Sequence, residues 1–156
     1  MGLHAKMSTE PVSRLKLRPA LRVNPTSTLR EAIEVMREGQ LGCVIVADSK
    51  DRPAGIFTEA MLRNLMASGT PPLAEPVSSH MAESFAWVKE TDSIETVLDG
   101  MEEKNVRFVV VVNKSGKIVG LTGQKGLMEY VAEHFPGEVM VQRLGTEPYP
   151  QQREGA

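Results

Sequence analysis

The sequence predicts an α/β (α+β) protein made of two copies of one β-α-β-β-α unit, packed sheet to sheet with pseudo-twofold symmetry. Three observations predict this fold. The sequence segment that begins at Gly55 is repeated from Gly120, 65 positions later, and the two copies align without a gap. An amphipathic helix pattern precedes each of these segments, and a continuous apolar run rich in β-branched residues follows each helix. Two copies at this spacing favour a pair of units over a longer array.

Composition limits the classes of protein that remain. The chain has 156 residues, of which 41% are hydrophobic and 24% charged, enough for one core or for two small halves that share one. Its net charge of -2 argues against a nucleic-acid partner, since phosphate-backbone binding needs clustered Lys and Arg. No apolar run approaches a membrane helix, and the N-terminus lacks a signal-peptide core. We therefore expect a cytoplasmic protein that does not enter a membrane.

A helix is predicted at the same place in each copy. Apolar residues recur at i, i+3, i+4 and i+7 from Leu29 and again from Ile94. The first helix begins with Thr28-Leu29-Arg30-Glu31, which has the form of a capping box. Asp92 or Ser93 can cap the second. Both apolar stripes are expected to face a core.

The strands and the closing helices also come in pairs. Turn-forming residues follow each long apolar run, which predicts that the chain reverses there into another short strand. The expected strands are 21–23, 41–47 and one ending at Phe57 in the first copy, and 86–88, 106–112 and one ending at Thr122 in the second. A second amphipathic helix is expected at about 58–66 and at about 123–133.

The pattern of repeats also predicts the domain boundaries. We expect a first domain at 12–70, a linker rich in Pro and Gly at 71–76, and a second domain at 77–135. The ends, 1–11 and 136–156, hold no sustained periodicity and are expected to be tails, with folding onto a neighbouring chain left open. Neither half covers its sheet alone, so Val44 and Val109 are expected in one connected core.

The repeated phrases resemble a tandem pair of cystathionine-β-synthase (CBS) domains over about 12–135. The residues that carry the resemblance are VNPTSTLREAIEVM, LGCVIVADSKDRPAGIFTEAML and VRFVVVVNKSGKIVGLTGQKGL. It implies a stand-alone regulatory module with two clefts for an adenosyl ligand such as AMP, ADP, ATP or S-adenosylmethionine. It also implies a homodimer that packs through the helix holding Met61 and Met66, and a protein partner that the sequence does not identify.

The chain departs from this family at one phrase. The family's last strand is typically followed by Gly, two residues, Ser or Thr, two residues and Asp, and the hydroxyl and carboxylate hold a ribose. Here Thr58 keeps the hydroxyl, but Met61 and Gly126 stand in the acidic positions and Gly123 replaces the second hydroxyl. Loss of a charge-assisted acceptor costs roughly ten- to hundredfold in affinity.

The resemblance carries twelve candidate ligand-binding residues onto this chain. They are Arg22, Val23, Gly42, Cys43, Ile56, Thr58, Met61, Trp87, Val88, Arg107, Phe108 and Lys125.

Several of these residues also have a purely structural interpretation. Thr58 is equally well placed to cap a helix, and Arg107 to form a structural salt bridge. Trp87 can stack on a base or fill the cleft. Lys125 lies in GQKG, which lacks the spacing of a phosphate-binding P-loop, so a solvent-facing side chain is expected. Cys43, the single cysteine, is expected to be a reduced, buried, small hydrophobe.

Two functions remain open. The first is a sensory module that binds an adenine nucleotide or related metabolite, and the second is a dimeric scaffold without a small-molecule ligand. We do not expect an enzyme, because no nucleophile, base and orienting group can be named together. No metal site is expected either, because His4, His80 and His134 have no ligands at the required spacing.

Overall fold

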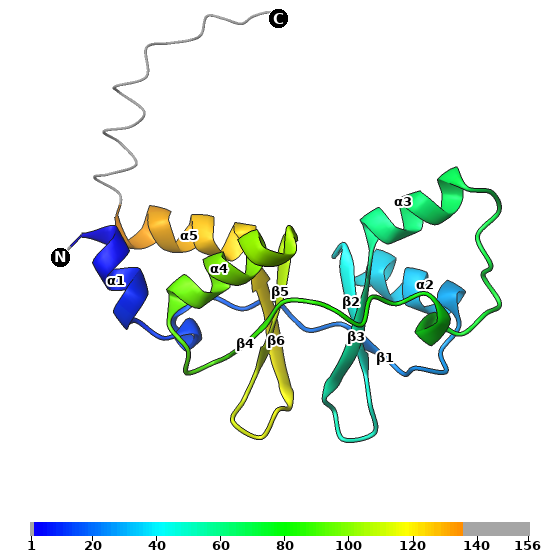
Figure 1. Cartoon of the computed structure of the whole chain (residues 1–156), viewed down its shortest axis with the longest axis horizontal. Helices are drawn as coiled ribbons and strands as arrows, with labels where there is room; N and C mark the ends of the chain where they lie inside the picture. Colours follow the sequence, from blue (N-terminus) through cyan, green and yellow to red (C-terminus); the bar gives the residue numbers. More distant parts are fainter. Residues whose placement is uncertain (1, 136–156) are drawn as a thin grey trace, which may run out of the picture.

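The computed structural model describes residues 2–135, which form two α+β units lying side by side (Figure 1). Each unit has a three-stranded sheet, in the order β1-β2-β3 or β4-β5-β6, whose middle strand pairs parallel with the short strand and antiparallel with the last. The identical topologies confirm the predicted repeat. The strands are β1 (Arg22–Val23), β2 (Cys43–Ala47), β3 (Pro53–Thr58), β4 (Trp87–Lys89), β5 (Phe108–Val112) and β6 (Ile118–Gly123).

The helices lie on the outer sides of the two sheets, which face each other in the middle of the molecule (Figure 1). Each unit has the two predicted helices, and α1 joins those of the second unit. The helices are α1 (Leu3–Thr9), α2 (Leu29–Gly39), α3 (Glu59–Ala67), α4 (Ile94–Lys104) and α5 (Gln124–His134). Two short 3-10 turns, η1 (Val12–Arg14) and η2 (Val77–Ser79), complete the described elements.

The predicted capping box forms at the start of α2. The Glu31 backbone N–H donates to the Thr28 hydroxyl at 3.1 Å, and the Thr28 backbone N–H donates to the Glu31 carboxylate at 2.8 Å. In α4, Ser93 occupies the N-cap without a side-chain hydrogen bond, and the Asp92 carboxylate instead accepts the Lys89 backbone N–H at 2.9 Å. The cap prediction is therefore confirmed for the first helix only.

The middle strands are covered on both faces, as predicted. Ile45 and Val110 lie in a hydrophobic cluster between the two sheets, which confirms sheet-to-sheet packing. Val44 and Val109 point the other way and lie in two separate clusters beneath the helices. The expectation of one connected core holding both residues is wrong, because side chains alternate along a strand and their neighbours build the shared interior.

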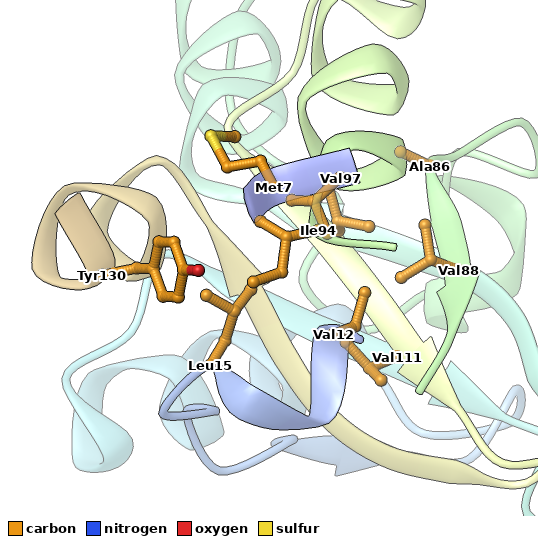
Figure 2. Close-up of a cluster of buried hydrophobic side chains, with 10 residues drawn as sticks. Met7, Val12, Leu15, Ala86, Val88, Ile94, Val97, Val111 and Tyr130 are labelled. Atoms are coloured by element: carbon orange, nitrogen blue, oxygen red, sulfur yellow. The ribbon is translucent and has the colours of Figure 1, made fainter. Parts of the chain in front are cut away.

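The chain crosses between the units at two equivalent places. Val12 is buried among residues of the second unit, and its backbone N–H donates to the Asp92 carbonyl at 2.8 Å (Figure 2). Val77 is buried in the first unit, and its N–H donates to the Ser27 carbonyl at 2.7 Å. Each unit is therefore completed by a segment from the other part of the sequence.

The N-terminal residues differ from the predicted tail. Leu3–Thr9 form helix α1, which packs against α4 of the same chain and buries Met7 (Figure 2). With seven residues, α1 is too short to produce a sustained periodic signal, and its inner face is marked only by Leu3 and Met7, four residues apart. The predicted tail at 136–156 lies outside the described residues.

A hydrogen bond from Tyr130 to the Glu10 carboxylate ties α5 to the segment after α1. This hydrogen bond, with Lys6 and Arg14 each 3.6 Å away, lowers the pKa of Glu10 below its ordinary 4.5, despite partial desolvation. Burial and then the contact with Glu10 raise the pKa of Tyr130 to about 12.

The Glu10–Tyr130 contact predicts a pH-dependent stability. A carboxyl group whose pKa is lowered by folding stabilises the protein above its unfolded pKa, and the contribution is lost as the pH falls through the folded pKa. We therefore expect Tyr130→Phe to lower the free energy of unfolding at pH 7 and the difference from wild type to shrink below pH 4.5. Urea unfolding between pH 7 and 3 measures this difference, and a constant difference across that range would contradict the assignment.

Two candidate ligand clefts

Two clefts lie where the ends of the last strands meet the starts of the following helices. The α3 cleft has a volume of about 290 Å³ and is lined by residues around the start of α3, including Thr58, Glu59 and Arg63. The α5 cleft has a volume of about 390 Å³ and is lined by residues around the start of α5, including Gly123 and Lys125. Both volumes are in the range of small-ligand sites.

The two clefts are equivalent under the 65-residue repeat. Gly42, Ile56 and Thr58 of the α3 cleft correspond to Arg107, Leu121 and Gly123 of the α5 cleft. Each cleft is completed by residues from the opposite unit, so a bound ligand would contact both units. Arg107 and Phe108 line both clefts.

The structure brings half of the predicted ligand-binding residues to these clefts. Gly42, Ile56 and Thr58 line the α3 cleft together with Arg107 and Phe108. Lys125 lines the α5 cleft with the same Arg107 and Phe108. These six are Gly42, Ile56, Thr58, Arg107, Phe108 and Lys125.

The candidates on the short strands lie elsewhere. Arg22 forms an ion pair with Asp51, with 2.7 Å between Nε and Oδ1, and donates to the Ile118 carbonyl at 2.9 Å. Together with Val23 it lines a separate hollow of about 680 Å³ whose walls carry acidic side chains. Trp87, the counterpart of Arg22, is 54% exposed and lines neither cleft, so it neither fills nor faces them.

Three further candidates lie in or against the hydrophobic clusters, away from the clefts. Val88 belongs to the core of the second unit, and Met61 packs against the core of the first. Cys43 is fully buried between the sheets, where desolvation raises the pKa of its thiol to about 12. The prediction that Cys43 is a buried small hydrophobe is confirmed, because its thiol has neither the exposure nor the acidity of a nucleophile.

Thr58 and Gly123 show how the two helix starts differ. The Met61 backbone N–H donates to the Thr58 hydroxyl at 3.3 Å, so the predicted N-cap is confirmed. At Gly123 a Cβ atom would lie 1.9 Å from the Arg107 carbonyl oxygen, so no side chain fits there. The second unit therefore has no place for the hydroxyl of the family phrase.

Several polar groups in the α5 cleft lack partners. The hydroxyl of Thr122 is buried and has no hydrogen-bond partner among residues 2–135. In the same residues Arg107 makes no ion pair or side-chain hydrogen bond, so the structural salt bridge proposed for it does not form. Lys125 is exposed, as predicted.

Sequence reasoning missed some cleft residues. Arg18 reaches the α5 cleft because the crossing segment pairs with β6, where its N–H donates to the Leu121 carbonyl at 2.8 Å and its carbonyl accepts the Leu121 N–H at 3.1 Å. No local pattern marks this pairing. Glu59 and Arg63 lie on α3 near Thr58. Their place beside Thr58 could have been predicted, because residues one and five positions after Thr58 lie near it at the start of a helix.

Other kinds of site find no support in the described part of the chain. Within residues 2–135, no three His, Cys, Asp or Glu side chains are grouped to hold a metal ion. None of the helices described there has both the length and the apolar character needed to cross a bilayer.

Comparisons with known proteins agree with this geometry. An uncharacterized 17.7 kDa protein of Acidianus ambivalens is 28% identical over 116 residues, which is 74% of this chain and 70% of that protein. The CBS domain protein PAE2072 from Pyrobaculum aerophilum, solved in complex with AMP, has a TM-score of 0.68 at 23% identity and covers 80% of this chain and 99% of its own.

A second solved structure has the same fold. The CBS domain pair of protein MJ0100, in complex with 5-methylthioadenosine and S-adenosyl-L-methionine, has a TM-score of 0.71 at 15% identity and covers 81% of this chain and 98% of its own. The family model of the CBS domain matches residues 7–68 and 77–133, one match for each unit. The chain therefore belongs to the CBS domain family, as a tandem pair.

Proposed function

We propose that the chain is a regulatory module that binds an adenine nucleotide or related adenosyl compound in the clefts between its units and signals to a partner protein. The observation that carries the proposal is Arg107, an exposed cation without an ion-pair partner in the described residues, which lines both clefts beside Phe108. A guanidinium suits phosphate, and an adjacent apolar wall suits a purine.

The ligands of the structural relatives support the same class. One relative holds AMP and another holds 5-methylthioadenosine with S-adenosyl-L-methionine. In this chain Ile56 and Leu121 supply equivalent apolar walls, one to each cleft. The proposed role is regulation, because such ligands bind without being transformed and the single cysteine, Cys43, is buried away from both clefts, where burial raises the pKa of its thiol.

Signalling would follow from the way each cleft spans both units. A ligand in the α3 cleft touches Thr58 of the first unit and Asn105 of the second. Binding would therefore favour one relative tilt of the units, by no more than its difference in affinity for the two arrangements. We place the module in the cytoplasm as a homodimer through α3, which buries none of its residues and leaves Met66 59% exposed.

Thermal unfolding of the full chain tests the proposal with AMP, ADP, ATP, S-adenosylmethionine and NAD. A ligand at about a hundred times its dissociation constant adds about 2.7 kcal/mol, which raises the midpoint by several degrees for a chain of this size. At least one adenosyl compound is expected to do so. GTP and CTP at equal ionic strength are the control for nonspecific effects of phosphate.

One specific observation favours a second function, that of a dimeric scaffold with no small-molecule ligand. Met61 packs into the first core, and the close approach of Gly123 to Arg107 leaves no room for a side chain there. In addition, Met61 and Gly126 stand at the two acidic positions of the family sequence, so neither unit has that carboxylate. Unchanged midpoints with every compound at millimolar concentration, together with a stable dimer by light scattering, would favour the scaffold.

A further inference from the structure

We infer that the two clefts are chemically inequivalent and that the α5 cleft alone takes the phosphate groups of a multiply phosphorylated ligand. The inference rests on the proposed ligand-binding role of the clefts and assigns the ligand class of one of them. Arg18, Arg107 and Lys125 would hold the phosphates, and one such ligand would bind per chain.

The charge of the α5 cleft carries the first step. Its lining residues include three cations, Arg18, Arg107 and Lys125, and no carboxylate. A carboxylate outside the lining, Glu129, pairs with Arg18 at 2.7 Å between Nη2 and Oε2. Arg107 and Lys125 have no ion pair within residues 2–135, so the cleft keeps an excess of positive charge. Phosphate is the anion that such a group of guanidinium and ammonium groups binds well.

The start of α5 adds the positive end of a helix dipole to the same cleft. Gly123 is the N-cap of this eleven-residue helix and supplies no side-chain cap. The Gln124 N–H donates to the Arg107 carbonyl at 3.3 Å, and the helix start lies at the cleft, whose lining includes Lys125 and Gly126. Thr122, which is 3% exposed, also contributes to the lining, and its buried hydroxyl has no hydrogen-bond partner in the described chain. Gly126 leaves the helix turn above that hydroxyl without a side chain, since a Cβ there would lie 2.6 Å from Thr122 Oγ1.

The α3 cleft shares Arg107 but differs at the other points. Its helix start is capped by Thr58, and its lining holds the Glu59 carboxyl group as well as the cation Arg63. That group lies over Gly42, with Cδ 2.9 Å from the place a Cβ would occupy. A carboxylate in the cleft repels phosphate, so a second multiply charged ligand is disfavoured here.

Isothermal titration of the full chain with pyrophosphate tests the inference. We expect one pyrophosphate per chain and an affinity that falls as salt rises. Lys125→Gln should weaken binding by roughly tenfold, the effect of losing one charge-assisted contact. Arg63→Gln, in the equivalent cleft, and Lys114→Gln, in the β5–β6 turn, each remove one positive charge and should change the affinity by less than about twofold.

The inference is overturned by two equivalents of pyrophosphate, by an equal effect of Arg63→Gln and Lys125→Gln, or by no heat of binding at millimolar pyrophosphate. Parallel titrations with ATP and adenosine separate it from the proposed function. If ATP and adenosine bind and Lys125→Gln leaves the affinity for ATP unchanged, the inference is wrong and the proposed function stands. If pyrophosphate binds and ATP binds no more tightly than pyrophosphate, the inference stands and the proposed function is wrong.

Discussion

Gly123→Ala is expected to lower the free energy of unfolding by about 3 kcal/mol. An alanine Cβ at this position would stand 1.9 Å from the Arg107 carbonyl oxygen and 3.3 Å from the Phe108 Cα, both backbone atoms at the start of the adjoining strand β5 or just before it. Because backbone cannot rotate away as a side chain can, β5 and β6 would have to separate where they form the shared wall of the clefts. Chemical denaturation at pH 7 measures the loss.

Gly100→Ala is the matched control for this substitution. Gly100 lies inside α4, and its Cβ would stand 3.5 Å from the Ala86 Cβ, an ordinary contact. There alanine should stabilise the protein by up to about 1 kcal/mol through its higher helix propensity. If Gly123→Ala were as stable as Gly100→Ala, the close contact between Gly123 and Arg107 would be absent in solution.

Phe57→Ala is expected to cost about 3–5 kcal/mol. Phe57 is fully buried on β3, in the cluster between the first sheet and helices α2 and α3, and it is among the largest fully buried side chains described. Truncation would leave a cavity that the rigid sheet cannot close. A loss of this size is a large part of the 5–15 kcal/mol typical of a folded domain.

Met128→Ala on α5 is the control for Phe57→Ala. Met128 is 63% exposed, so its truncation in the free protein should change stability by no more than about 0.5 kcal/mol. Urea unfolding followed by circular dichroism compares the two. A loss below about 1 kcal/mol for Phe57→Ala would show that the first unit repacks around the gap, contrary to the density expected of a native core.

Much of the fold follows from signals that lie within a few residues of one another. The helices were predictable because apolar periodicity and the Thr28 cap act within one turn. The strand reversals were predictable because Asp48 and Asn113, 65 positions apart, each accept two backbone N–H groups of their own turn. Repetition then gave the topology of the second unit from that of the first.

Other features depend on contacts between distant residues. No local signal shows that Val12 enters the second unit, because a short apolar segment fits either core. Arg18 reaches the α5 cleft only through that crossing. The resemblance to the family predicts Trp87 near the ligand, but its strand lies at the edge of the sheet, where the side chain is exposed.

The repeat predicts where a residue lies in the fold better than it predicts which side chains surround that residue. Thr122 and Gly126 occupy the places of Phe57 and Met61, so the second unit has much smaller side chains there. Tyr130 and helix α1 add bulk to its core instead. The sequence shows that the second unit lacks the large side chains found at Phe57 and Met61. The structure shows that helix α1 helps to fill the core in their place.

The exchange of Val12 and Val77 between the units has a consequence for dissecting the protein. A cut in the 71–76 connection would yield two polypeptides. The N-terminal one would carry Val12, which belongs to the core of the second unit, and the C-terminal one would carry Val77, which belongs to the core of the first. Mixed together, such fragments should assemble by complementation into one body. The two units therefore depend on each other, because displacing the segment around Val12 or Val77 would disturb the core of the opposite unit.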